Sequence, residues 1–229
     1  MKTHGQPAVV LLSGGADSTV LLHHVGRHLG HAPLHAISFQ YGQRHVRELA
    51  CAAHQADRAG ARHVVLDISF MGTLLREGTA LVAGGAAVPS LADLAKKDLD
   101  QPPTYVPNRN MMLLAMAAAY AETREIRDIF YGAQAQDEYG YWDCTPDFVR
   151  RLNRVFALNR RNRVRIHAPF AGMKKAEIIR LGLDLGVDFA HTWSCYRGGE
   201  RACGTCPTCV ERLNAFAAAG VADPLSYMP

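Results

Sequence analysis

The chain has 229 residues and a formal net charge of +4, and 48% of its residues are hydrophobic and 20% charged. This length and composition fit one α/β domain with a good hydrophobic core and a small appendage. No apolar run approaches the roughly 20 residues of a membrane-spanning helix, and residues 1–7 lack the apolar segment of a secretory signal. We therefore expect no membrane association, and the modest charge by itself says little about a nucleic-acid partner.

Short apolar runs alternate with amphipathic segments, which is typical of a parallel sheet covered by helices on both faces. The pattern predicts strands at residues 8–12, 34–39, 62–67, 128–132 and 164–168. It predicts helices after the first strand and at residues 46–59, 110–122, 147–158 and 174–185. Glycines and prolines punctuate residues 69–103, where we expect a functional flap with a short helix at 91–97.

The loop S-G-G-A-D-S at residues 13–18 joins the first predicted strand to the first helix. Such a turn leaves backbone N–H groups at a helix start, where the helix dipole favours phosphate oxygens. The two glycines allow close approach to an anion, and the two serines add hydroxyl donors. Asp17 would repel phosphate unless a cation intervenes, so we interpret it as a Mg²⁺ ligand or a helix cap. A plain strand-to-helix turn is the alternative explanation of the loop.

Two further segments have groups suited to a nucleotide. Phe39 and Tyr41 follow the second strand, at the carboxyl end where α/β sheets bind ligands, and an aromatic ring there can pack on adenine. Core packing is the alternative for Phe39. Arg109 and Lys175 each stand at a predicted helix start, where the helix dipole disfavours a cation, so each indicates a nearby anion such as phosphate.

An acidic loop follows the fourth predicted strand. Its residues Asp137 and Asp143 are candidates for binding Mg²⁺ or for pairing with the N–H edge of a guanine-like base. A solvated acidic loop is the alternative. Cys144, which follows Asp143 directly, leaves a reactive thiol open as a further interpretation.

Four of the six cysteines have the spacing C-x7-C-x2-C-x2-C and are Cys195, Cys203, Cys206 and Cys209. Four thiolates suit a tetrahedral structural Zn²⁺, which leaves no open position for water. A [4Fe–4S] cluster also takes four cysteines and is the alternative. Metal-binding thiols indicate a reducing compartment, so we expect a cytoplasmic location. We place a domain boundary here, with the α/β domain over residues 1–191 and a zinc-binding knuckle and helix over 192–229.

The loop at residues 13–18 resembles the SGG-x-DS signature of ATP pyrophosphatases, which cleave ATP between its α and β phosphates. Further segments follow in order, namely F-x-Y-G-Q at 39–43, P-x-R-N at 107–110, G-Y-x-D-C at 140–144, Pro169 with K-A-E at 175–177, and T-W-S-C-Y at 192–196. Together these segments span nearly the whole chain and resemble the 7-cyano-7-deazaguanine synthase family of queuosine biosynthesis. The resemblance implies a parallel-sheet, adenine nucleotide α-hydrolase-like (PP-loop, Rossmann-like) α/β fold, a C-terminal zinc site and a homodimer.

The resemblance also implies a ligase that uses ATP and Mg²⁺ to convert 7-carboxy-7-deazaguanine and ammonia into a nitrile through an acyl adenylate and an amide. With the residue chemistry above, it places catalysis at Ser13, Asp17, Ser18, Arg109 and Lys175. We expect ATP at Leu12, Ser13, Gly14, Gly15, Ala16, Asp17, Ser18, Phe39, Tyr41, Arg109 and Lys175. We expect the deazaguanine at Gln43, Asp137, Tyr141 and Asp143.

Three positions depart from the family's common residues: Asn108 replaces a frequent Gly, Trp142 a Pro, and Thr145 an Arg near the expected base pocket. An alternative function is therefore a relative that stops at the amide, or that transfers the acyl group to another amine such as a protein terminus. A second alternative is a zinc-knuckle protein that binds RNA through seven arginines between residues 150 and 165. For that run we expect a solvated helix face or an interface, and no direct nucleic-acid binding.

Overall fold

The computed structural model describes residues 5–42, 47–75, 79–81, 103–137 and 141–228. At its centre lies a parallel sheet of five strands in the order β3-β2-β1-β4-β5. The strands are β1 (Ala8–Leu11), β2 (Leu34–Gln40), β3 (Arg62–Asp67), β4 (Asp128–Phe130) and β5 (Arg165–His167). All five predicted strands and the predicted α/β fold class are thus confirmed, and strand ends differ from the prediction by at most two residues.

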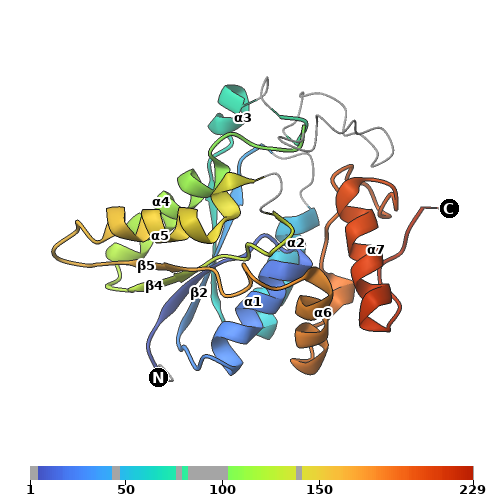
Figure 1. Ribbon diagram of the computed structural model, residues 1–229, viewed down its shortest axis with the longest axis horizontal. Coiled ribbons are helices and arrows are strands. Elements are labelled where there is room, and N and C mark those ends of the chain that lie inside the picture. Colours follow the sequence, from blue (N-terminus) through green and yellow to red (C-terminus); the bar gives the residue numbers. More distant parts are fainter. Residues whose placement is uncertain (1–4, 43–46, 76–78, 82–102, 138–140, 229) are drawn as a thin grey trace.

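Helices cover both faces of the sheet (Figure 1). One face packs against α4 (Arg109–Glu122) and α5 (Pro146–Phe156). The other face packs against α1 (Ala16–Arg27), α2 (Arg47–Arg58), α6 (Lys175–Asp184) and α7 (Pro207–Ala219). The short helices α3 (Phe70–Leu75), η5 (Trp142–Cys144) and η6 (Phe189–His191) were not predicted. Most of the predicted flap, including the helix at 91–97, lies outside the described residues.

The central strand β1 connects the two hydrophobic cores. All four of its residues are buried, and alternate side chains point to opposite faces. Val9 and Leu11 belong to the core that includes Leu114 of α4, whereas Val10 belongs to the core that includes Val20 of α1. A strand that is apolar on both sides is stable only with helices on both faces. This requirement places β1, and the loop that follows it, in the middle of the molecule.

The order of the strands changes direction beside β1. From β1 the chain adds β2 and β3 on one side, and after α4 it crosses to β4 and β5 on the other side. In open α/β sheets, loops diverge at such a switch point and leave a crevice outside the carboxyl ends of the strands. Here the loop at 13–18 borders the crevice after β1, and Gly132 borders it after β4. A Cβ on Gly132 would lie 3.3 Å from Ser18 N, so the two loops are in close contact.

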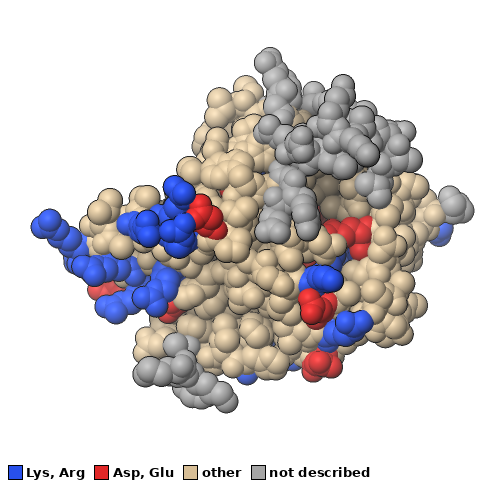
Figure 2. Space-filling view, viewed as in Figure 1, with Lys and Arg blue, Asp and Glu red and all other residues tan. Residues whose placement is uncertain are grey.

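The seven arginines of the basic run are all exposed and gather over α5 and the turn before β5, at the left of Figure 2. Asp147 pairs with Arg150 and, at 2.6 Å between Oδ2 and Nε, with Arg151. Exposed arginines with a local carboxylate partner are consistent with the expected solvated helix face. No helix among the described residues has the length and apolar character needed to cross a membrane.

Candidate active site

A cavity of about 580 Å³ opens at the carboxyl ends of β1, β2 and β4. Its wall combines the loop after β1 with Lys175 at the start of α6 and Glu211 of α7. A concave site of this volume at the switch point of an α/β sheet is suited to a small-molecule ligand. Of the residues predicted for ATP and substrate, the wall includes Leu12, Ser13, Gly15, Ala16, Asp17, Ser18, Phe39, Tyr41, Arg109, Asp137, Tyr141 and Lys175.

The structure places two other predicted residues away from the cavity wall. Asp143 is buried, and its Oδ2 accepts a hydrogen bond from Asn110 N at 2.9 Å, so this carboxylate holds the first turn of α4. Gly14 has a φ of +88°, and a Cβ there would lie 2.1 Å from Glu48 O. Only glycine fits this left-handed, crowded position, so Gly14 shapes the loop. Gln43 lies outside the described residues.

Serine hydroxyl groups close the loop at 13–18. Ser18 Oγ accepts a hydrogen bond from Ser13 N at 3.1 Å and lies 2.9 Å from Ser13 Oγ. Gly15 N donates to Ser13 Oγ at 3.2 Å. Gly15 is the N-cap residue of α1, and no side chain caps this helix. The alternative interpretation of Asp17 as the helix cap is therefore wrong. The first turn of α1 borders the cavity without a capping side chain, an arrangement that favours an anion.

Lys175 connects this loop to the C-terminal helix. Its Nζ donates hydrogen bonds to Asp17 Oδ2 at 3.0 Å and to Glu211 Oε2 at 2.9 Å. Burial opposes the charge on the lysine, but Asp17 and Glu211 outweigh that effect and hold the pKa of Lys175 above its usual value. Two carboxylates of the protein itself thus pair with Lys175 at this helix start, and its contact with a phosphate stays a prediction.

Acidic oxygens remain at the same end of the cavity after Lys175 is paired. Asp17 Oδ1 is buried and has no hydrogen-bond partner within the described part of the chain. Asp137 accepts a hydrogen bond from Gln134 N at 3.0 Å, and burial raises the pKa of Asp137 to about 6 while Lys175 opposes the shift. An orphaned carboxylate oxygen among other acids is the kind of donor that a divalent cation such as Mg²⁺ takes.

Arg109 supplies positive charge on another wall of the cavity. Burial lowers its pKa, but interactions with Tyr41, Tyr196 and Tyr141 outweigh burial, so the pKa of Arg109 is raised and the group stays charged. Within the described residues, no carboxylate lies at ion-pair distance from Arg109. Burial raises the pKa of Glu48, which interacts with Arg109, to about 7. The guanidinium therefore has no carboxylate partner among the described residues, and the anionic ligand expected from its helix-start position stays a prediction.

Cys144 is a buried thiol rather than a reactive one. Asn110 Nδ2 donates a hydrogen bond to its Sγ at 3.2 Å, and burial raises the pKa of Cys144 well above its usual value. The thiolate is the nucleophilic form of cysteine, so a raised pKa disfavours that form. The structure therefore favours a packing role for Cys144.

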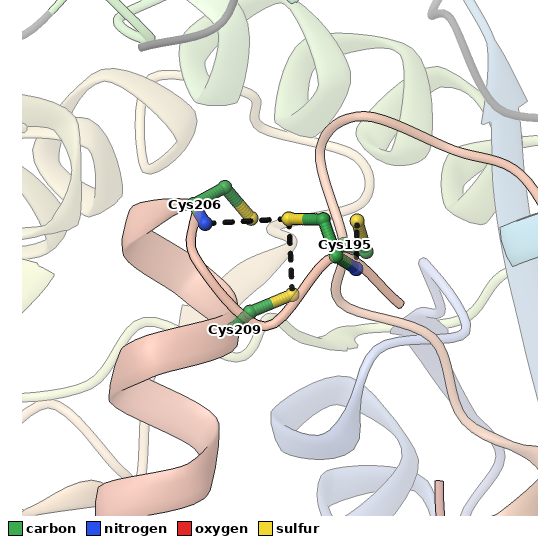
Figure 3. A group of neighbouring side chains, drawn as sticks. Cys195, Cys206 and Cys209 are labelled. Carbon is green, nitrogen blue, oxygen red and sulfur yellow. Dashed lines mark hydrogen bonds between the residues drawn. The ribbon is translucent and has the colours of Figure 1, made fainter. Parts of the chain in front are cut away.

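The four cysteines of the C-terminal segment come together as a buried cluster (Figure 3). Their sulfur atoms all lie within 4.8 Å of one another, and Cys203 Sγ lies 3.9 Å from Cys209 Sγ. Tetrahedral zinc with Zn–S bonds near 2.3 Å separates its sulfurs by about 3.8 Å. Backbone N–H groups of Cys203 and Cys206 donate to sulfur atoms of the cluster, which favours the thiolate form. The chemistry and spacing of the donors fit a structural metal ion.

Comparisons with known proteins agree with this geometry. A family model described as "Queuosine biosynthesis protein QueC" matches residues 7–220. The 7-cyano-7-deazaguanine synthase of Marinobacter nauticus is 43% identical over 222 residues, which is 96% of each chain. The synthase of Caldicellulosiruptor saccharolyticus is also 43% identical over 222 residues, covering 96% of this chain and 95% of the relative.

The chain belongs to the 7-cyano-7-deazaguanine synthase family. It is an enzyme of queuosine biosynthesis, as the order of its motifs predicted. Members of the family use ATP, and their reaction implies a deazaguanine acid and ammonia as substrates.

A solved structure supports the fold. The U34-tRNA thiolase NcsA from Methanococcus maripaludis with its [4Fe-4S] cluster aligns with a TM-score of 0.50 at 15% sequence identity. The alignment covers 86% of this chain and 63% of that chain. Similarity at this level of identity concerns the fold alone, and it agrees with the PP-loop type of sheet that the 13–18 loop predicted.

The three departures from the common residues of the 7-cyano-7-deazaguanine synthase family have local explanations. Asn108 has a φ of +55°, a left-handed conformation that glycine adopts easily and asparagine tolerates. Thr145 is the N-cap of α5 and accepts a hydrogen bond from Phe148 N at 3.2 Å. Trp142 donates from Nε1 to the hydroxyl of Tyr105 at 2.7 Å.

Reasoning from the sequence missed several polar residues of the cavity wall, among them Glu48, Tyr196 and Glu211. Tyr196 closes the T-W-S-C-Y segment that matched the 7-cyano-7-deazaguanine synthase family, and this signal could have identified it. Glu211 lies two residues after Cys209, and nothing in the sequence separates it from a surface acid on a helix. Its role depends on the packing of α7 beside Lys175.

Proposed function

We propose that this chain makes 7-cyano-7-deazaguanine through two successive adenylations in the cavity after β1. The carboxylate of 7-carboxy-7-deazaguanine attacks the α-phosphate of ATP, which forms an acyl adenylate and releases pyrophosphate. Ammonia then displaces AMP and gives the amide. The amide oxygen attacks the α-phosphate of a second ATP and releases a second pyrophosphate, and loss of AMP and of both amide protons leaves the nitrile. The observation that carries the proposal is the phosphate-type loop at 13–18, which faces a cavity with Arg109 and Lys175.

We assign the ATP phosphates to this loop and to the two cations. The hydroxyl groups of Ser13 and Ser18 and the first-turn N–H groups of α1 are suited to the pyrophosphate leaving group. Arg109, which has no ion-pair partner among the described residues, is suited to the charge that develops on the α-phosphate. We assign the adenine to the side of Phe39 and Tyr41, with Leu12 and Ala16 completing the wall.

Two metal ions belong to the proposal. Mg²⁺ is assigned to Asp17, whose Oδ1 is buried without a partner in the described residues, and it would neutralise phosphate charge. Zn²⁺ is assigned to the four cysteines, as a structural ion of a C-terminal unit over residues 192–229 that follows the α/β unit over 1–191. We expect the enzyme to act in the cytoplasm as a homodimer, because thiolate ligands need a reducing compartment and the family resemblance implies a dimer.

The deazaguanine is assigned to the acidic side of the cavity. Asp137 and Tyr141 line it and offer acceptors for the N–H edge of the base. Gln43 stays a predicted contact, and Asp143 is expected to act through the start of α4 that it holds.

The experiment is a single assay with ATP, 7-carboxy-7-deazaguanine and ammonia that follows AMP, pyrophosphate and product mass together. Two AMP per nitrile is the expected result. One AMP with an amide would overturn the second adenylation, and acyl transfer to a protein amine would overturn the role of ammonia. Arg109→Lys keeps the charge but loses the planar fork of the guanidinium, and we expect it to slow AMP release by about tenfold or more.

A further inference from the structure

Two histidines and an aspartate meet outside the active-site cavity, between α2 and η6. His54 belongs to α2, Asp188 directly precedes η6, and His191 ends it. One ligand atom from each of the three residues lies within 4.8 Å of the others. None of the three lines the active-site cavity. We propose that His54, Asp188 and His191 form a second metal site, for a divalent transition metal such as Zn²⁺.

The distances suit a small coordination sphere. Asp188 Oδ2 lies 3.4 Å from His54 Nε2 and 2.7 Å from His191 Nδ1. Zinc bonds of about 2.0–2.1 Å to nitrogen and oxygen separate neighbouring ligand atoms by about 3.4 Å in a tetrahedron. The pair with His54 already has this spacing, and the pair with His191 reaches it if the atoms move apart by roughly 0.7 Å.

The peptide scaffold holds the three ligands in place before any metal binds. Gln55, next to His54 on α2, is fully buried, and its Nε2 donates to the carbonyl oxygens of Asp188 at 2.7 Å and His191 at 3.0 Å. The backbone N–H of Ala190 donates to Asp188 Oδ1 at 3.2 Å. Outer hydrogen bonds of this kind orient ligands and raise metal affinity. A buried glutamine thus ties the helix that bears one ligand to the turn that bears the other two.

Asp188 satisfies His191, but it leaves the hydrogen bonding of His54 incomplete. His54 Nε2 is buried and forms no hydrogen bond of normal geometry with the described residues, although Asp188 Oδ2 lies nearby. The rings of His54 and His191 are stacked with centroids 4.0 Å apart at 17°. Imidazole nitrogens are the commonest protein ligands of divalent transition metals.

The donor set also defines the class of metal. Two imidazoles and one carboxylate favour Zn²⁺, Ni²⁺ or Cu²⁺ over Mg²⁺ and Ca²⁺, which prefer oxygen donors. The side chain of His191 is 55% exposed, so solvent reaches the site and completes the coordination sphere. The cluster therefore differs from the four-cysteine site, which is buried and closed by protein sulfurs alone.

The test is equilibrium dialysis of the full-length protein, isolated with its four-cysteine site filled, against micromolar Zn²⁺, followed by metal analysis. We expect the wild type to hold one more zinc per chain than His54→Ala and His191→Ala. Loss of a ligand is expected to weaken the affinity for the second zinc ion by more than roughly 10- to 100-fold. A loss of that size already follows when a residue that only hydrogen-bonds to a ligand is replaced. His28→Ala, at an exposed histidine of the same chain, is the matched control and is expected to behave as the wild type.

Two outcomes would overturn the proposal: equal zinc in the wild type and both alanine variants, or equal loss in His28→Ala. Asp188→Asn provides an independent check, because it keeps the size of the side chain while removing the charge that binds metal. If an alanine variant loses its folded circular dichroism spectrum, His191→Gln replaces it, since that exposed side chain contributes little to packing.

Discussion

Nζ of Lys175 lies 3.0 Å from Oδ2 of Asp17, although the two residues are 158 positions apart in the chain. The same ammonium binds Glu211 on α7, the helix that also bears the metal ligand Cys209. One lysine therefore joins the phosphate-type loop, the start of α6 and the metal-binding C-terminal segment. The charge that Lys175 presents at the cavity wall depends on all three elements being in place.

Asp17→Asn is expected to abolish most ATP-dependent turnover while the protein stays folded. The substitution removes the negative charge that pairs with Lys175 and that is assigned to binding Mg²⁺. We expect AMP formation to fall by about 10²–10³-fold, as for loss of a preorganised electrostatic group. Asp57→Asn, at an exposed acid of α2, is the control. Turnover within a few-fold of the wild type would contradict the role of Asp17.

Glu211→Gln tests whether an acid next to the metal site positions Lys175. The variant keeps the shape of the side chain but weakens its hold on the ammonium, so we expect kcat to fall by about tenfold. Zinc content and thermal stability should change little, because no metal ligand is altered. A matching loss of zinc would instead show that Glu211 acts through the metal site.

Cys206→Ser is expected to remove the metal and to destabilise the fold. Structural zinc contributes about 10 kcal/mol or more to small domains, and each kcal/mol shifts Tm by about 2–4 °C in a chain of this size. We therefore expect Tm to fall by at least about 10 °C, with loss of ATP turnover because α7 lines the cavity. Cys51→Ser, at a buried thiol outside the four-cysteine set, controls for loss of a packed sulfur. Unchanged zinc content in Cys206→Ser would contradict the assignment.

Gly14→Ala separates steric crowding from backbone strain. The new Cβ would meet Glu48 O at 2.1 Å as well as requiring a positive φ. Gly60→Ala requires a positive φ of +62° in open space and is the matched control, with an expected cost of about 1–2 kcal/mol. We expect Gly14→Ala to lower the free energy of unfolding, measured in urea, by clearly more than Gly60→Ala does. We also expect it to lose ATP turnover. Equal losses in the free energy of unfolding for the two variants would show that the backbone of α2 moves aside to admit the new Cβ.

Glu48 is expected to make stability fall as pH rises from acid to neutral. Burial raises its pKa to about 7 in the folded chain, above the ordinary value of 4.5, so the folded state keeps a proton that the unfolded state loses. This contribution is fully present below pH 4.5 and is lost as pH rises through 7, which amounts to about 3 kcal/mol. Between pH 5 and 8, the free energy of unfolding measured in urea should therefore fall by about 1–3 kcal/mol less for Glu48→Gln than for the wild type. Parallel losses in both proteins would contradict the shift.

The sequence by itself determined the parallel α/β fold, the phosphate-type loop and the four-cysteine cluster. Each of these depends on neighbours in the chain: the apolar run of β1 requires helices on both faces, two glycines shape one turn, and four cysteines fall within 15 residues. Local patterns of this kind are visible in the residue order. The family followed from several such patterns in a fixed order.

Only the tertiary structure decided which charges meet. The partner of Lys175 could not be read from the sequence, because Asp17 and Glu211 come from opposite ends of the chain and meet only when α6 and α7 pack together. For the same reason Asp143 was assigned to substrate, whereas it binds the backbone of α4. Electrostatic energy depends on distance and burial, and long-range packing alone sets both.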